Sequence, residues 1–201
     1  MKHIAVLGEY REDADHPFGN VEKELKSIFH ALGEVEILQD NKKEEWNLLK
    51  YDLLVIYNDV WEEPVEANRI AALLEYAASG KTIMAIHCGI FYFQANSEFL
   101  SLIGGRFYHH PPRCEMTYLT GMESSFTLYE EPYLFHFTEN VAKDVFLVCR
   151  YGENFLPAGW SVPYGKGKFI YFAPGHDSDS FSNKEYIKLI RTYAKRALDE
   201  S

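Results

Sequence analysis

The sequence feature that most constrains the fold is a repeated alternation of short apolar runs with segments of helical periodicity. Four mostly apolar runs read HIAVLGEY, EVEIL, DLLVIYND and KTIMAIHCG, and they begin at residues 3, 34, 52 and 81. Apolar strands separated by helices are typical of a parallel sheet whose two faces are both covered. The first half of the chain is therefore predicted to be α/β, doubly wound and flavodoxin-like, with a mainly parallel sheet.

The segments between these runs have the pattern of helices. In residues 20–33 the apolar side chains recur at helical spacing, and Gly33 suits the end of a helix. Residues 42–51 are predicted to form a short connecting helix. Residues 62–80 give the clearest pattern, with Pro64 near the start and Gly80 at the end. The apolar face of this helix carries Ile70, Leu73, Leu74 and Ala77.

The second half of the chain is rich in β-type segments. These segments read EMTYLTG, SSFTLYEEPYLFHF, DVFLVCRYG and PAGWSVPYGKGKFIYFAPGHD. The last contains a predicted hairpin with its turn at residues 164–168. Residues 182–198 are predicted to form a helix capped by Ser182 or Asn183. With 201 residues, no repeat and no linker-like stretch, the chain is expected to form a single domain over residues 1–201.

Composition argues against several classes of function. The formal net charge is −10 and basic residues are scattered, which argues against nucleic acid, because phosphate binding needs clustered positive charge. No apolar run reaches the ~18 residues of a membrane helix, and the start lacks the apolar core of a signal peptide. A cytoplasmic protein without a membrane partner is expected. The sequence is compatible with either a monomer or a homo-oligomer. Three widely spaced cysteines, Cys88, Cys114 and Cys149, are expected to be reduced thiols.

Polar side chains follow several predicted strands at the point where each strand ends. His87 and Cys88 follow one strand, and His176 and Asp177 follow another, KFIYFA. In an open α/β sheet, ligands bind beyond the carboxyl ends of the strands, so His87 and His176 are expected to face one cleft. Further candidates at strand ends or in neighbouring loops are Glu9, Tyr10, Arg11, Asn58, Asp59, His109, His110, Glu131 and Asp179.

The histidines are the main candidates for chemistry. Imidazole transfers protons near neutral pH and is the commonest metal ligand in proteins. A divalent metal would suit three histidines and a carboxylate, if the fold brings them together. The candidate ligands are His87, His109, His110 and His176, with Glu131 as the carboxylate. No two histidines lie three or four residues apart, so the alternative is a core histidine at position 87 and a small buried hydrophobe at Cys88.

Several motifs follow one another along the chain and read AIHCG, LIGGRFYHHPP, EEPYLF and PAGWSVPYGKGKFIYFAPGHDSDSF, followed by the terminal helix. Together they resemble the ThuA-like (trehalose utilisation) family of the class I glutamine amidotransferase-like superfamily. The most specific is the last, in which a strand leads into Gly175, His176 and Asp177. The resemblance covers nearly the whole chain and implies a flavodoxin-like fold.

The resemblance also bears on whether Cys88 is a nucleophile. Amidotransferases of the superfamily carry a nucleophilic cysteine in a Gly-x-Cys-x-Gly elbow after the equivalent strand. On that pattern Ala85 takes the first glycine position and His87 takes the nucleophile position, whereas Cys88 falls one residue later. His176 and Asp179 match the superfamily's His-x-Glu pair only in part. A glutaminase mechanism is therefore not expected.

The ThuA-like resemblance implies the catabolism of trehalose and related disaccharides after oxidation to 3-keto derivatives. A carbon beside the ketone is acidic, so a histidine could remove its proton while a second acid or a metal stabilises the enolate. The predicted catalytic residues are His87 and His176, as base and acid, with Glu131. The predicted substrate-binding residues are Glu9, Tyr10, His109, His110, Tyr133 and Asp177. The alternatives are an amidase-type hydrolase using Cys88 and His176, and a non-catalytic sugar-binding protein.

Overall fold

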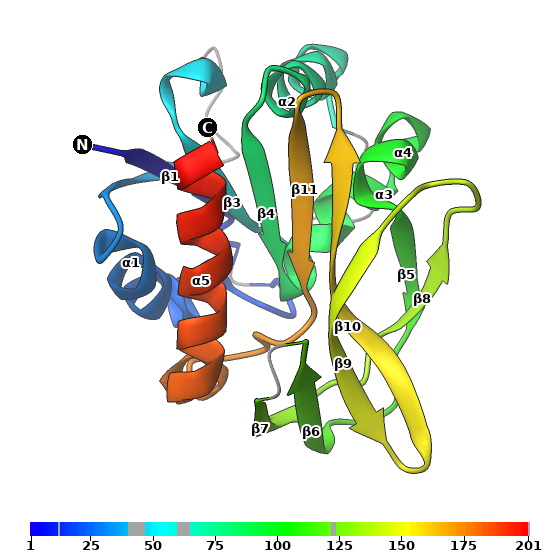
Figure 1. Ribbon diagram of the computed structural model, residues 1–201. Helices are drawn as coiled ribbons and strands as arrows, with labels where there is room; N and C mark the ends of the chain where they lie inside the picture. Colours follow the sequence, from blue (N-terminus) through cyan, green and yellow to red (C-terminus); the bar gives the residue numbers. More distant parts are fainter. Residues whose placement is uncertain (12, 40–46, 60–64, 122–123, 201) are drawn as a thin grey trace.

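The computed structural model describes residues 1–11, 13–39, 47–59, 65–121 and 124–200. Within them a nine-stranded sheet runs in the order β2-β1-β3-β4-β11-β10-β9-β6-β7, and β5 pairs with β8 in a two-stranded sheet (Figure 1). The strands are β1 (His3–Gly8), β2 (Glu34–Gln39), β3 (Leu53–Tyr57), β4 (Thr82–Ile86), β5 (Gly105–His109), β6 (Cys114–Thr120), β7 (Ser125–Glu130), β8 (Leu134–Phe137), β9 (Asp144–Tyr151), β10 (Asn154–Tyr164) and β11 (Gly167–Phe172). The helices are α1 (Glu22–His30), α2 (Ala67–Ala78), α3 (Phe91–Gln94), α4 (Leu100–Ile103) and α5 (Lys184–Glu200).

The half of the sheet from β2 to β11 is parallel. Every residue of β3 and β4 is buried, as expected for strands covered on both faces. Helices α1 and α5 contact each other, and α5 contacts β3 and β4, whereas α2 contacts β4 and β11 (Figure 1). Right-handed crossovers from β1 to β2 and from β3 to β4 run in opposite directions, which puts α1 and α2 on opposite faces. The prediction of a doubly wound α/β fold is confirmed.

The other half of the sheet, from β11 to β7, is antiparallel, so the sheet as a whole is mixed. β10 and β11 form the predicted hairpin, and Gly165 in its turn has a φ of 59°. The turn also returns the chain close to α2, where a Cβ on Gly165 would lie 2.6 Å from the Cα of Ala78. The hairpin thereby joins the two halves of the sheet.

The helix ends agree with the sequence patterns in part. The Asn183 side chain accepts hydrogen bonds from the backbone N–H groups of Glu185 and Tyr186, so Asn183 caps α5. Gly80 follows α2 with a φ of 114°, a conformation that favours glycine. In the predicted helix at 42–51, residues 48–50 form one 3₁₀ turn and residues 42–46 lie outside the described part, as does Pro64.

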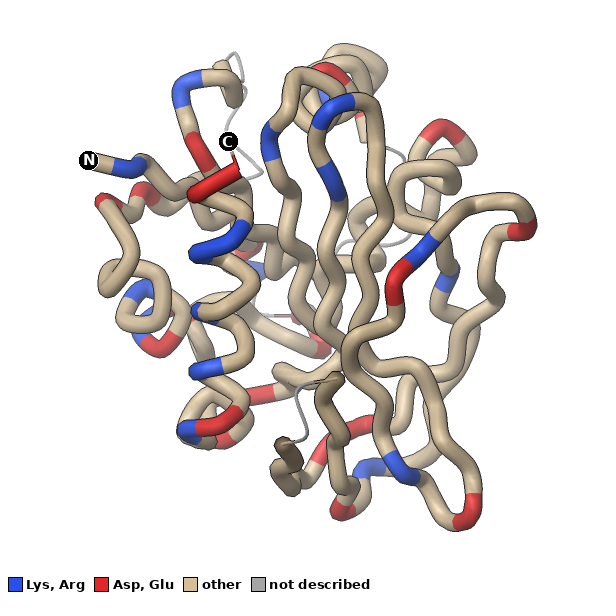
Figure 2. The backbone as a smooth tube through the Cα atoms, viewed as in Figure 1, with Lys and Arg blue, Asp and Glu red and all other residues tan. Residues whose placement is uncertain are grey.

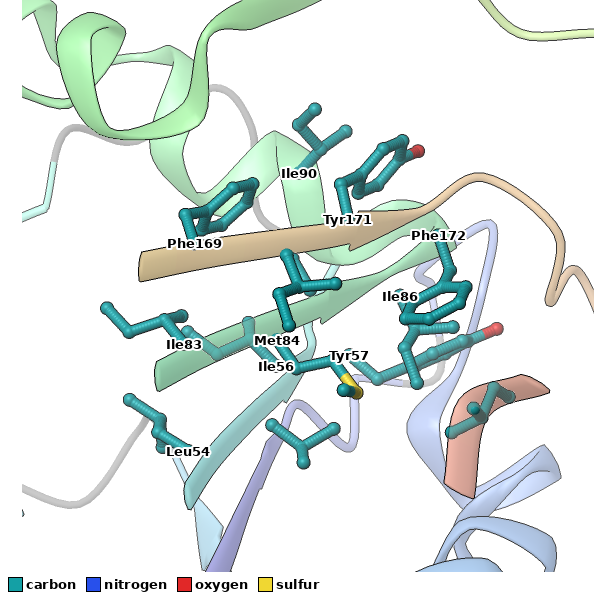
Figure 3. Close-up of a cluster of buried hydrophobic side chains, with 14 of the residues drawn as sticks. Leu54, Ile56, Tyr57, Ile83, Met84, Ile86, Ile90, Phe169, Tyr171 and Phe172 are labelled. Carbon is teal, nitrogen blue, oxygen red and sulfur yellow. The ribbon is translucent and has the colours of Figure 1, made fainter. Parts of the chain in front are cut away.

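The core lies between the parallel strands and their helices. Figure 3 shows buried side chains of β3, β4 and β11, with Ile56 and Phe169 on one face of the sheet and Met84 on the other. Lys, Arg, Asp and Glu are absent from β1, β3 and β4, and these residues lie mainly in helices, loops and outer strands (Figure 2). In the described residues, no helix combines the length and apolar character needed to span a membrane.

The topology determines where a site can form. The strands β1, β3, β4 and β11 are parallel neighbours, so their carboxyl ends meet at one edge of the sheet. Between β1 and β3 the direction of the crossover connections reverses, and such a switch point leaves a crevice where ligands bind in open α/β sheets. The segments that follow β1, β3, β4 and β11 are therefore the ones expected to carry functional side chains.

Candidate active site

The segment after β4 forms a sharp elbow at His87. The strand ends at Ile86, and a short 3₁₀ turn, η3 (His87–Ile90), begins immediately. His87 has a φ of 50°, which is uncommon for a residue other than glycine and is found preferentially at functional sites. Two residues later, a Cβ on Gly89 would lie 2.2 Å from the backbone oxygen of Ile56, so only glycine fits. The elbow presents the His87 ring at the carboxyl edge of the sheet.

The ring of His87 is fully buried, and partners on both sides fix its orientation. Its Nδ1 donates to the backbone oxygen of Ala173 at 2.7 Å. Because a carbonyl only accepts, Nδ1 carries the hydrogen and Nε2 presents a lone pair. The Tyr133 hydroxyl lies 3.0 Å from Nε2, and the two rings stack with centroids 4.5 Å apart. His87 is thus bonded to side chains as well as to backbone.

His176 lies on the loop that follows β11. Gly175 before it has a φ of 134°, and a Cβ there would lie 3.3 Å from the Cβ of His87. The buried carboxylate of Glu130 accepts hydrogen bonds from Gly175 N at 2.8 Å and from His176 N at 3.3 Å, and it also accepts one from the hydroxyl of Ser180. These bonds hold His176 against the His87 elbow, with ring centroids 5.5 Å apart.

His16 completes the histidine group, although the sequence patterns did not point to it. It lies between β1 and a 3₁₀ turn, η1 (Phe18–Asn20), and 7% of its surface is exposed. Asp59, which follows β3, has its Oδ2 2.9 Å from the backbone N of His16 and 3.3 Å from its Nδ1. The opposite nitrogen, Nε2, lies 3.1 Å from Nδ1 of His176. The signal that could have found His16 is its segment, which follows β1 at the same edge of the sheet.

Glu131 lies at the centre of the three imidazoles. Its Oε2 is 3.5 Å from His16 Nε2, 3.5 Å from His87 Nε2 and 3.4 Å from His176 Nδ1. We call His16, His87, Glu131 and His176 the histidine cluster. One nitrogen or oxygen from each of them lies within 4.8 Å of the others, so the histidine cluster is able to hold a metal ion.

Burial and charge shift the ionisation of these groups in different directions. Burial by itself lowers the pKa of His16, but hydrogen bonds to the carboxylates of Asp59 and Glu131 outweigh it and raise that pKa to about 9. Burial and the neighbouring His16 lower the pKa of His87 to about 4. Burial opposes ionisation of Glu131, but the close approach of the three imidazoles holds its pKa well below the ordinary value. These shifts favour the charged form of His16, the neutral form of His87 and the ionised form of Glu131.

The other predicted site residues are distributed unevenly around the histidine cluster. Tyr133 contacts His87, and His110 has its Nδ1 3.8 Å from Oε1 of Glu131, with 37% of its side chain exposed. His109 is exposed, and its described ring contact is to His110 at 6.2 Å between centroids. The structure thus brings His110 to the site, whereas no described contact joins His109 to it.

Two predicted substrate-binding residues, Tyr10 and Asp177, have their side-chain partners outside the histidine cluster, and a third, Glu9, is buried. The Tyr10 hydroxyl donates to Glu22 on α1 at 2.8 Å. Asp177 accepts a hydrogen bond from Arg113 at 2.8 Å and lines a separate polar pocket. Glu9 is buried at the end of β1, with 8% exposed. The structure does not bring Tyr10 and Asp177 into the group that surrounds Glu131.

Cys88 is poorly suited to act as a nucleophile. The residue is fully buried, and burial raises the pKa of its thiol well above the ordinary value. A reactive cysteine needs exposure and a lowered pKa, because the thiolate is the attacking species. Both properties of Cys88 oppose the amidase interpretation.

Several solved structures have a similar architecture. Similar structures are a ThuA-like protein from Parabacteroides merdae (TM-score 0.80, 15% identity, 98% of this chain and 90% of that one) and another from Bacteroides uniformis (TM-score 0.74, 16% identity, 98% and 91%). A GH42 β-galactosidase from G. stearothermophilus is similar over 96% of this chain and 30% of its own length, with a TM-score of 0.68 and 17% identity. At these identities the similarity shows a shared fold.

Sequence comparison gives the family. A search of curated proteins finds no match to this chain. The profile of the ThuA family, described as trehalose utilisation, matches residues 12–193 and so includes every residue of the histidine cluster. The chain therefore belongs to the ThuA family and shares the α/β fold of solved ThuA-like proteins.

Proposed function

We propose that this protein is a carbohydrate-modifying enzyme and that the histidine cluster is its active site. The observation that carries the proposal is the convergence of His16, His87, Glu131 and His176 at the carboxyl edge of the parallel strands. Buried ionisable groups are costly to a fold, and groups with strongly shifted pKa values gather at functional sites. The description of the family as trehalose utilisation supports a sugar as the substrate class.

The reaction that suits these groups is proton abstraction beside a ketone, and the proposed substrates are 3-keto glycosides. A base removes the proton from the carbon next to the ketone, and the electron pair moves onto the carbonyl oxygen as an enolate. When the enolate collapses, the bond from the anomeric carbon to the leaving oxygen breaks, and an acid protonates that oxygen. Hydrogen-bond donors at the histidine cluster stabilise the enolate oxygen during this sequence.

The solvent exposure of each side chain determines which groups of the site can contact a bound sugar. His87 is fully buried, so it acts through Glu131 and Tyr133 rather than on the substrate directly. The side chain of His176 is 21% exposed and that of His110 is 37% exposed. These two imidazoles are the groups of the site that can exchange a proton with a bound sugar.

Exchange of the substrate proton with D₂O tests the proposal directly. The wild-type protein is incubated with 3-keto disaccharides and with the unoxidised sugars, and loss of the proton beside the ketone is followed by NMR. We expect exchange and turnover of the keto sugar alone, and a loss of ~10²–10⁴-fold in His176→Gln, which removes a proton-transfer group. His30→Gln, an exposed histidine at the end of α1, is the matched control and should react as wild type. Tight binding of sugars without exchange or turnover would instead support the non-catalytic alternative.

A further inference from the structure

We infer that the histidine cluster is the binding site of one divalent transition-metal ion of the zinc class. The ligands are His16 Nε2, His87 Nε2, His176 Nδ1 and Glu131 Oε2. Imidazole nitrogens together with a carboxylate oxygen suit zinc, iron, cobalt or manganese, whereas calcium and magnesium prefer oxygen ligands. The inference is carried by the arrangement of these four atoms and does not depend on the reaction proposed above.

The separations between the ligand atoms fit a tetrahedral ion. Zinc bonds of roughly 2.0–2.1 Å to nitrogen or oxygen give a distance of about 3.3 Å between neighbouring ligand atoms. Here His16 Nε2 is 3.1 Å from His176 Nδ1, and Glu131 Oε2 is 3.4 Å from His176 Nδ1. The Glu131 oxygen is 3.5 Å from Nε2 of both His16 and His87. No ligand pair is more than 4.8 Å apart, so small side-chain shifts would bring all four atoms into bonding distance.

Two of the histidines have the outer hydrogen bonds that metal ligands use. Metal-binding histidines commonly donate their second ring N–H to a carboxylate or a backbone carbonyl, which fixes the tautomer and directs the other nitrogen at the metal. His16 Nδ1 faces the Asp59 carboxylate at 3.3 Å, and His87 Nδ1 donates to Ala173 O at 2.7 Å. The Nε2 atoms of both rings are therefore directed into the same space.

The centre of the histidine cluster contains groups that a cation would satisfy. Oε2 of Glu131 is buried and reaches no partner with good hydrogen-bond geometry within the described chain, although three ring nitrogens surround it. His16 Nε2 and His176 Nδ1 face each other at 3.1 Å, and only one proton can lie between them. A metal ion would accept a lone pair from each of the two nitrogens and from the carboxylate at the same time. A single proton between the nitrogens cannot satisfy all three groups.

A bound ion would also divide the roles in the site, and this step depends on the proposed function. The ion would supply positive charge at the enolate oxygen. With His176 held as a ligand, His110 is the remaining exposed imidazole near Glu131 that could accept the proton. His110→Gln is then expected to lose turnover while its metal content stays that of the wild type.

Metal binding can be measured without any substrate. Untagged protein is stripped with a chelator and titrated with Zn²⁺ by calorimetry, and with Co²⁺ while the visible absorption of the bound ion is recorded. We expect one equivalent to bind, with Co²⁺ giving the strong absorption of a four- or five-coordinate site. His16→Ala and Glu131→Gln should lose stoichiometric binding, Asp59→Asn should weaken it by roughly 10–100-fold, and the control His30→Ala should bind as wild type.

Several outcomes would overturn the inference. One is stripped wild-type protein that binds neither ion stoichiometrically, and another is cluster variants that bind them as wild type does. Circular dichroism of each metal-free variant shows whether it has folded. If His16→Ala does not fold, the nearly isosteric variants Glu131→Gln and Asp59→Asn test the metal site in its place. If protein that binds no metal still catalyses proton exchange on a keto sugar, the proposed function stands and the metal inference is wrong. If the protein binds one equivalent of metal but does not react with keto sugars, the metal inference stands and the proposed function is wrong.

Discussion

At the scale of single residues, the elbow at His87 depends on its neighbours to maintain an unfavourable backbone conformation. The φ of 50° costs energy for a residue with a Cβ, of the order of 1–3 kcal/mol. Strand β4 holds it from one side and η3 from the other, and Tyr171 donates to the backbone oxygen of His87 at 3.0 Å. This conformation places the buried His87 ring at the end of β4. An extended backbone at this residue would point the ring in another direction.

Gly89→Ala is expected to disrupt this elbow. The new Cβ would lie 2.2 Å from the backbone oxygen of Ile56, and neither β3 nor η3 can move without breaking the sheet. The variant should lose about 3 kcal/mol or more of unfolding free energy, measured by urea denaturation. Gly19→Ala is the matched control, because its Cβ meets nothing nearer than 3.9 Å. Equal stability of the two variants would contradict this account of the elbow.

Cys88 should be chemically silent in the folded protein. Burial removes it from solvent and disfavours its thiolate, whereas Cys114 on β6 is half-buried. Iodoacetamide followed by peptide mass spectrometry should therefore label Cys88 only after urea is added. Cys88→Ala is expected to retain exchange on keto sugars. Rapid labelling of Cys88 in native protein, with loss of activity, would favour the amidase alternative.

At the scale of elements, the Glu130 carboxylate at the end of β7 joins that strand to the loop after β11. It accepts from Gly175 N, His176 N and the Ser180 hydroxyl, and all three donors lie between β11 and α5. Nothing in the sequence distinguishes Glu130 from its neighbour Glu131, yet the first fixes the loop and the second enters the histidine cluster. Adjacent residues at the end of β7 thus serve opposite sides of the backbone.

Glu130→Gln should loosen this loop. Glutamine keeps one accepting oxygen for these donors but loses the negative charge, and its NH₂ would face the backbone N of His176 in place of Oε2. Because hydrogen bonds to a charged acceptor are stronger than those to a neutral one, a loss of about 1–3 kcal/mol in unfolding free energy is expected. Ser180→Ala removes one bond and should cost less. A double-mutant cycle of the two changes should show coupling, because both act on one network. Additive effects would mean that Glu130 does not hold Ser180 in solution.

Asp52 gives the stability a dependence on acid pH. Its Oδ2 accepts from His3 N at 2.8 Å, and Lys81 Nζ is 3.7 Å from Oδ1. Burial opposes ionisation, but the His3 hydrogen bond and the Lys81 charge leave the pKa of Asp52 below its ordinary value. A lowered folded-state pKa contributes stability above the unfolded-state pKa, and that stability is lost as pH falls through the folded-state pKa.

The matched variants Asp52→Asn and Asp52→Ala separate charge from hydrogen bonding. Asn retains an oxygen for His3 N but no charge, so its stability should lie below wild type at pH 7 and approach it as the pH falls from the ordinary aspartate pKa, about 3.9, through the lower folded-state pKa. Ala removes both and should cost about 1 kcal/mol more at each pH. The measurement is urea denaturation across this range. A constant difference between wild type and Asn would show that the carboxylate charge contributes nothing.

At the scale of the whole molecule, an ion in the histidine cluster would join four segments that lie far apart in the sequence. Zn²⁺ at about 100 times its dissociation constant should add ~2.7 kcal/mol to the folded state. For a protein of this size that raises the Tm by roughly 5–10 °C. Thermal unfolding of stripped protein with and without Zn²⁺ measures the shift. Ca²⁺ is the control ion, and Glu131→Gln should show no rise with either.

The sequence predicts the parallel half of the fold well, because that half depends on local patterns. Apolar runs such as those of β3 and β4 are continuous when both faces of a sheet are covered, and the helix of α2 has a clear apolar face. The order of the later strands depends instead on long-range pairing. β11 lies between β4 and β10, although its sequence would suit other positions equally.

The site could be predicted only where it follows a strand end. His87 and His176 come directly after β4 and β11, so the topology rule identifies them. His16 lies deep in a polar loop with no periodic pattern, and only the folded chain brings it to Asp59. The choice between His109 and His110 depends on an irregular pairing of β5 with β8 after Phe107, and the alternation of side chains cannot be read there from sequence.

The central position of β11 has a consequence for biosynthesis. This strand is the last one along the described chain, yet it lies in the middle of the nine-stranded sheet. While a ribosome is still producing β11, at ~5–20 residues per second, β4 and β10 each have one unpaired edge. These edges expose backbone N–H and C=O groups to other nascent chains. A chain stopped before residue 167 would keep those edges open, so premature termination is expected to yield aggregates rather than a smaller folded protein.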